Sequence, residues 1–258
     1  MTEKNNADFS GRKIFFLYPS VMIQNNIVEG LAQNEFEVYS LNDENKLKKL
    51  LKKYPNSIVF ANISEGMLGN EWDNWIESIM TDSETAGVDI GIIAYGENAN
   101  MRQKYTEQMG IRCGYTVIKP DYTVVVRQLI SILNMANAKG RRKYIRVLIE
   151  KETDITASLP INGNITCGNI KDISTAGFSC LLPNDPELVR NSHFNNIQIR
   201  LETQTIKAQG MFFCSRMQGT EKIYVFLFTK SASPELQTGI HKFIRCLLQS
   251  KIENELGE

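Results

Sequence analysis

The sequence has little histidine, no clustered cysteine and no long apolar run. Its 258 residues include only two histidines, His193 and His241, which lie far apart. Because zinc sites use clustered cysteine and histidine, this pattern predicts no metal site. The odd, scattered set of cysteines predicts reduced thiols, most of them packed as small hydrophobes in strands or helices. These are Cys113, Cys167, Cys180, Cys214 and Cys246.

No apolar run approaches the roughly 18 residues that a membrane-spanning helix needs. The first six residues are polar and mixed in charge, which is not the pattern of a secretory signal. We therefore expect a cytoplasmic protein without membrane insertion.

An excess of charge of either sign is also missing, since 29 basic residues balance 29 acidic ones. This balance argues against a nucleic-acid or membrane binder that depends on bulk attraction. The second half also lacks an aromatic and basic stripe for single strands. Any nucleotide site must therefore be local.

Catalytic signatures are missing as well. The chain has no GxxxxGK[ST] loop, no GxSxG elbow and no acidic cluster with metal-ligand spacing. We expect a protein that is not an enzyme and needs no cofactor.

The length exceeds the usual size of one domain and predicts two, at residues 1–138 and 139–258. The first half repeats a strand and a helix five times. Near-continuous apolar strands are expected at 13–18, 36–41, 57–63, 89–95 and 114–118. Between them, apolar residues recur at helical spacing, as in Met101, Tyr105 and Met109. This alternation predicts an α/β domain with a doubly wound, flavodoxin-like parallel sheet.

The second half changes character after Lys139-Gly140 and predicts a mainly β domain, a small antiparallel barrel or sandwich. A final helix is expected with Ser233 as its N-cap, Pro234 in its first turn and an apolar face for packing on the barrel. Residues 253–258 are expected to fray. The strands are predicted at 144–151, 157–159, 165–170, 177–182, 196–202, 205–216 and 222–229.

Two short motifs lie in order around the first three of these strands. Arg142 and Arg146 form an RxxxR pair, with Arg141 beside it. An arginine fork can donate to guanine O6 and N7, pair with phosphate or stack on a base. Taken alone, the basic stretch 139–143 also fits a solvated linker.

The second motif, DxSxxG, begins 26 residues after Arg146 and contains Asp172, Ser174 and Gly177. A carboxylate can accept from guanine N1–H and N2–H₂, a serine can donate or accept, and a glycine permits close backbone approach or positive φ. Taken alone, the motif also fits an Asx turn between two strands.

In this order, on an all-β segment that ends in a helix, the two motifs resemble the PilZ domain, a bacterial receptor for cyclic di-GMP. The resemblance covers roughly residues 139–250 and implies a small antiparallel barrel with a C-terminal helix. It implies that Arg142 and Arg146 contact guanine and phosphate, Asp172 and Ser174 read the second guanine, and Gly177 shapes the turn. Arg141 is a further candidate contact.

The first half resembles a response-regulator receiver domain that lacks its phosphorylation chemistry. Lys119-Pro120 matches the family, but Tyr18-Pro19-Ser20, Asn62 and Tyr95 replace the acidic metal ligands, the phosphorylated aspartate and the Thr or Ser. The resemblance implies a pseudo-receiver that contacts a protein partner or dimerises; a flavodoxin-like domain with a chance Lys-Pro pair is the alternative.

The resemblance implies a non-catalytic cyclic di-GMP receptor. We expect ligand gripped by the RxxxR linker and the DxSxxG turn to order the 136–146 segment and reorient the two domains. The alternative is a PilZ-like adaptor that acts through protein contacts without nucleotide. Motility, exopolysaccharide control and virulence are outputs typical of the family, and no residue selects among them.

Overall fold

The computed structural model describes residues 11–149, 155–201, 204–229 and 234–257. The chain divides into two compact units. Unit 1 contains Met1–Lys143 together with Gln249–Glu258, and unit 2 contains Tyr144–Leu248. The sequence predicted a domain boundary between residues 138 and 139, with the whole final helix in the second domain. In the structure, the first compact unit extends to Lys143 and also includes the end of the final helix.

Unit 1 is built on a five-stranded parallel sheet in the order β2-β1-β3-β4-β5. This is the strand order of flavodoxin-like and receiver domains, so the doubly wound prediction is confirmed. β1, β3 and β4 are buried along their whole length, as strands covered by helices on both faces should be. The strands are β1 (Ile14–Leu17), β2 (Val38–Leu41), β3 (Ile58–Asn62), β4 (Asp89–Ala94) and β5 (Tyr115–Val117).

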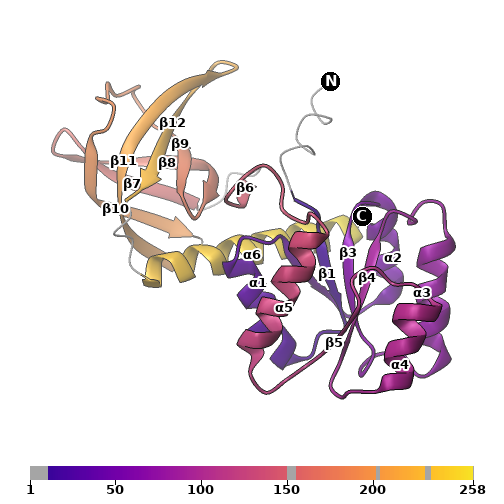
Figure 1. Cartoon of the computed structure of the whole chain (residues 1–258). Coiled ribbons are helices and arrows are strands. Elements are labelled where there is room, and N and C mark those ends of the chain that lie inside the picture. The colour runs from indigo at the N-terminus through magenta and orange to yellow at the C-terminus, as the bar shows by residue number, and fades with distance from the viewer. Residues whose placement is uncertain (1–10, 150–154, 202–203, 230–233, 258) are drawn as a thin grey trace. The chain divides into compact units, whose positions relative to one another are not determined.

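Helices cover both faces of this sheet, with α1 and α5 on one face and α2, α3 and α4 on the other (Figure 1). Asp43 and Asp121 cap α2 and α5 by accepting from backbone N–H groups of their first turns. Two of the five predicted helices contain a π-helical segment, η1 and η2. The segments are η1 (Ile23–Val28), α1 (Glu29–Gln33), α2 (Glu44–Lys53), α3 (Asn70–Thr81), α4 (Ala99–Gln103), η2 (Lys104–Gln108) and α5 (Tyr122–Met135).

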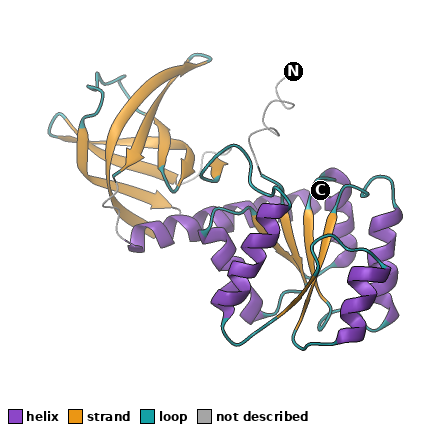
Figure 2. Ribbon diagram, viewed as in Figure 1, coloured by secondary structure: helices purple, strands orange, loops and turns teal. Residues whose placement is uncertain are grey.

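Unit 2 is an antiparallel barrel (Figure 2). The sheet order is β6-β8-β7-β10-β11-β12-β9, and pairing of β8 with β9 closes a six-stranded barrel to which β6 is added. Of the two architectures that the sequence left open, barrel and sandwich, the barrel is therefore present. Its strands are β6 (Arg146–Leu148), β7 (Ile155–Ile161), β8 (Asn164–Ser174), β9 (Gly177–Leu181), β10 (His193–Leu201), β11 (Gln204–Gln218) and β12 (Glu221–Phe228).

The barrel core is apolar and strongly aromatic. β7 alternates buried and half-buried residues along its length, as a strand with one core face should. Phe178 stacks on Phe226 with ring centroids 5.2 Å apart, and Phe194 meets the same ring edge-on. These contacts join β9, β10 and β12 across the inside of the barrel.

The last helix, α6 (Pro234–Gly257), is longer than expected. Leu236, Ile240 and Ile244 enter the barrel core, which confirms the predicted packing. The prediction that residues 253–258 fray is wrong up to Gly257, because Glu255 is held by side chains of unit 1. The proposed N-cap, Ser233, lies outside the described residues. No helix in the described ranges is long and apolar enough to cross a bilayer.

The cysteines differ in environment. All five are free, but only Cys113 and Cys180 are buried, whereas Cys167 and Cys246 are exposed. The expectation that most pack as hydrophobes is therefore wrong for the exposed pair. Burial raises the pKa of the Cys113 thiol to about 12.

Candidate functional site

The short strand β6 brings Arg146 beside the second motif. β6 pairs antiparallel with the end of β8, so that Arg146 lies opposite Ser174 and Leu148 lies opposite Asp172. Val147, between them, points into the core and is 2% exposed. Because side chains alternate along a strand, burial of Val147 directs Arg146 to the outer surface of the barrel.

Asp172 is the centre of this group. Its side chain is 8% exposed, and Arg146 Nε lies 3.4 Å from Asp172 Oδ1. The Ser179 hydroxyl donates to Asp172 Oδ2 at 2.5 Å. A buried carboxylate needs such partners, because an unpaired buried charge is costly. The site thus contains a cation and an anion that already contact each other.

A β-bulge places Asp172. The pairing of β8 with β9 shifts register between Ile170 and Asp172, which leaves Lys171 without a partner on β9. After the bulge, Asp172 lies directly opposite Ser179, which accounts for their hydrogen bond. Bulges commonly re-aim a side chain beside a functional site.

The rest of the motif forms a tight hairpin, whereas the predicted strands 165–170 and 177–182 left residues 171–176 as the connection. Asp172 and Ser174 lie in β8, and Gly177 begins β9, so only Thr175 and Ala176 make the turn. The predicted strand end at residue 170 is therefore wrong by four residues. The Ser174 hydroxyl donates to the Gly177 carbonyl at 3.2 Å, which closes the hairpin from inside.

Gly177 is needed because another backbone passes close to it. A Cβ built on Gly177 would lie 2.1 Å from the Phe226 carbonyl oxygen and 2.9 Å from Leu227 Cα. Both reasons that the sequence offered for glycine apply, because Gly177 has a φ of +158° and strand β12 approaches its backbone closely.

Arg141 and Arg142 lie before β6 in an exposed segment without regular structure. By compactness they belong to unit 1, whereas Arg146 belongs to unit 2. Within the barrel, the structure therefore brings together Arg146, Asp172, Ser174 and Gly177. The ligand-binding roles of these four residues and of Arg141 and Arg142 stay predictions.

Sequence reasoning missed Ser179. The signal was present, because β9 alternates Gly177 and Ser179 with the core residues Phe178 and Cys180. A strand that places a serine on its outer face, opposite the aspartate of a neighbouring strand, predicts this hydrogen bond once the register is known.

The group can bind a planar, hydrogen-bonding anion. A carboxylate has about four lone-pair sites, so Asp172 can accept from Ser179 and still accept from a ligand N–H. Arg146 is 38% exposed and can turn its remaining N–H groups to a phosphate or a base. Among the described residues, no group of three or more His, Cys, Asp or Glu could hold a metal ion.

The carboxyl edge of the parallel sheet in unit 1 is filled by side chains that bond to one another. The Asn62 amide, 1% exposed, donates to the Tyr18 carbonyl at 2.9 Å. The Tyr18 ring packs edge-on against Trp72 at 6.0 Å, and its hydroxyl donates to Glu44. Burial, together with the hydrogen bond to Glu44, raises the Tyr18 pKa to about 12. Doubly wound domains bind ligands at this edge, and here these side chains occupy it.

No family model matches the chain, and no curated protein matches its sequence. The PilZ domain of YcgR from Escherichia coli with c-di-GMP matches 46% of this chain and 98% of its own, at 14% identity and a TM-score of 0.38. The MrkH–c-di-GMP complex of K. pneumonia matches 47% of this chain and 57% of its own, at 20% identity and a TM-score of 0.39.

A response regulator from Desulfuromonas acetoxidans matches 48% of this chain and 98% of its own, at 10% identity and a TM-score of 0.40. PilZ structures and a response-regulator structure thus match the two halves of the chain.

Proposed function

We propose that this protein is a non-catalytic receptor for cyclic di-GMP. The observation that carries the proposal is the group of Arg146, Asp172 and Ser179 on the outer face of the barrel, an arginine fork against a buried carboxylate. The matching structures of YcgR and MrkH are both complexes with c-di-GMP, which is consistent with the proposal.

Each motif residue has a proposed role. Arg146, with Arg142 and Arg141, binds the guanine edge and the phosphates of a ligand that is a dianion with two guanine bases. Asp172 accepts from guanine N1–H and N2–H₂, and Ser174 contributes to reading the second guanine. Ser179 orients the Asp172 carboxylate, and Gly177 keeps the hairpin closed.

The ligand is also proposed to act on the arrangement of the two units. The RxxxR segment joins them in the chain, so a ligand that holds this segment and the barrel favours the arrangement in which both contacts form. Unit 1, whose carboxyl edge lacks the acidic residues of a receiver, is proposed to contact a protein partner.

An adaptor that works without nucleotide is the second candidate. It is favoured by the low exposure of Asp172 and Ser174, 6% and 5%, because a ligand must gain access to both. The two candidates differ in a single measurable property, the affinity for cyclic di-GMP.

Isothermal titration calorimetry with cyclic di-GMP tests the proposal. We expect saturable binding to the wild type and a loss of about 10- to 100-fold in Arg146→Ala and Asp172→Ala, because each removes charge-assisted hydrogen bonds worth about 1.5–3 kcal/mol. Ser179→Ala is expected to lose about fivefold, the equivalent of one ordinary hydrogen bond of about 1 kcal/mol.

Arg200→Ala is the matched control, since Arg200 is an exposed arginine of β10, a strand that pairs with neither β8 nor β9. It should bind as the wild type does. Absence of binding to folded wild-type protein would overturn the receptor and favour the adaptor. Equal affinity in Asp172→Ala and wild type would overturn the proposed site.

A further inference from the structure

The last residues of α6, 249–257, contact the edge of the parallel sheet in unit 1. The Gln249 side-chain amide donates from Nε2 to the Ser40 carbonyl at 2.8 Å, and its Oε1 accepts from the Ser40 N–H at 3.0 Å. A carboxamide offers the same donor and acceptor pair as a peptide group. Gln249 therefore occupies the place that the backbone of a neighbouring strand would take.

Ser40 lies on the edge strand β2, which pairs with β1 on one side. The carbonyls of Glu37 and Leu41 accept from β1 and from Tyr18, so they point into the sheet. The Ser40 N–H and C=O groups point away from β1 and bond to the Gln249 side chain. Edge strands with open N–H and C=O groups are templates for pairing with other chains, and covering them with a helix prevents this.

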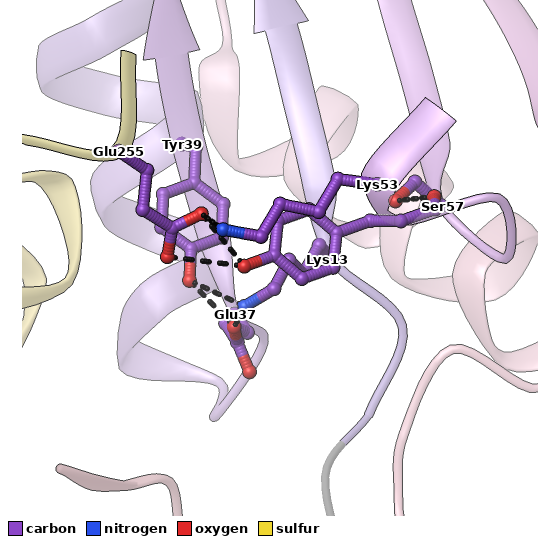
Figure 3. Close-up of polar contacts among 7 residues, drawn as sticks. Lys13, Glu37, Tyr39, Lys53, Ser57 and Glu255 are labelled. Carbon is purple, nitrogen blue, oxygen red and sulfur yellow. Dashed lines mark hydrogen bonds and ion pairs between the residues drawn. The ribbon is translucent and has the colours of Figure 1, made fainter. Parts of the chain in front are cut away.

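A second anchor lies six residues along the same segment. The Glu255 carboxylate accepts from Lys53 Nζ at 2.8 Å and from the Tyr54 hydroxyl at 2.8 Å, at the end of α2. Figure 3 shows Glu255 beside Lys53, next to the polar cluster of Lys13, Glu37 and Tyr39. The segment is thus held at two points by polar side chains.

Attachment of this segment is limited. Within residues 249–257, which the structure describes throughout, Ile252 is the one buried side chain. The Lys53–Glu255 ion pair is 58% and 29% exposed, so water and salt weaken it. Ser40 Oγ is buried and has no hydrogen-bond partner in the described part of the chain, which also costs free energy.

We propose that residues 249–257 form a latch, a releasable cover that closes the β2 edge of unit 1. While the latch is docked, Gln249 occupies the Ser40 backbone groups. When it releases, these groups become available for pairing. The latch is an intramolecular contact between residues 249–257 and the edge strand and α2 of unit 1.

Native-state hydrogen exchange of the Ser40 amide, followed by NMR on the full chain, tests the latch. Gln249→Ala should speed exchange at Ser40 about fivefold or more, the change expected for loss of one hydrogen bond. Glu255→Ala should also speed it, because undocking of the remote anchor releases the whole segment. Asn254→Ala changes an exposed residue of the same helix and should leave Ser40 as in the wild type.

The Ile14 amide, which donates to the Glu37 carbonyl at 2.9 Å between β1 and β2, reports on the sheet itself and should be unchanged in all three variants. If the Ser40 amide exchanges as slowly in Gln249→Ala as in the wild type, the latch is overturned. Faster exchange in Gln249→Ala but not in Glu255→Ala would also overturn it, because Gln249 would then be a local contact.

Discussion

At the scale of single residues, the motif has a structural role besides its proposed role in ligand binding. Gly177 sits where β12 passes too close for any side chain, and Ser174 bonds inside the hairpin. Asp172 is held by Ser179 and Arg146. The pattern DxSxxG therefore specifies a bulged, tightly closed hairpin, and that hairpin places the carboxylate.

Gly177→Ala should lower the free energy of unfolding of unit 2 by about 2–3 kcal/mol or more, because the new Cβ overlaps the Phe226 carbonyl and the strands must separate. Chemical denaturation followed by near-UV circular dichroism measures this change.

Gly219→Asn is the matched control for that variant. Gly219 has a φ of +62° and open space around it, and asparagine tolerates this conformation. The Gly219→Asn substitution should lower the free energy of unfolding of unit 2 by less than about 1 kcal/mol. Similar losses in the two variants would contradict the steric explanation.

At the scale of elements, α6 serves both units. Leu236, Ile240 and Ile244 pack in the barrel core, whereas Gln249 and Glu255 bond to unit 1. The amphipathic pattern of the helix predicted that its first half packs on the barrel. The same pattern did not predict the contacts of Gln249 and Glu255 with unit 1, because these residues are polar. A polar residue near the end of a helix has the same sequence signature whether it is solvated or bonded to another element.

The pKa of Glu255 provides a test of this docking. Burial acts to raise it, but hydrogen bonds from Lys53 and Tyr54 outweigh burial and hold it below its usual value of 4.5. A lowered pKa means that the carboxylate stabilises the docked segment above about pH 4.5, and that this contribution is lost as the pH falls through the lowered value.

An NMR titration of the Glu255 carboxyl should give a pKa below 4.5 in the wild type and a higher value in Lys53→Ala. Lys49→Ala removes an exposed lysine of the same helix and should leave the pKa unchanged. A wild-type Glu255 that titrates at its usual value would show that the segment is not docked in solution.

At the scale of the whole molecule, two units of different architecture share one chain that returns to the first unit at its end. The chain connects them twice, through the segment that contains Arg141 and Arg142 and through α6. The proposed reorientation by ligand would therefore involve two connections in the chain.

Small-angle X-ray scattering should detect this effect. Saturating cyclic di-GMP is expected to change the scattering profile of the wild type, because ligand held by the RxxxR segment and the barrel selects one arrangement. Arg146→Ala should show no change at the same ligand concentration. Identical wild-type profiles with and without bound ligand would contradict domain reorientation while leaving the receptor proposal standing.

The sequence alone determined the doubly wound sheet of the first unit and the antiparallel β character of the second, but its strand pattern left barrel and sandwich open. Apolar runs in alternation with helical periodicity specify the doubly wound sheet, and period-two strands specify the antiparallel unit, because burial of one face imposes those repeats. The motifs also assigned Arg146 and Asp172 to one proposed site, and in the structure the two side chains contact each other. Only the tertiary structure decided the strand register, and with it the bulge at Lys171, the partner Ser179 and the contact that requires Gly177. Register and polar docking depend on residues distant in sequence, as Gln249 and Ser40 do, so no local pattern contains them.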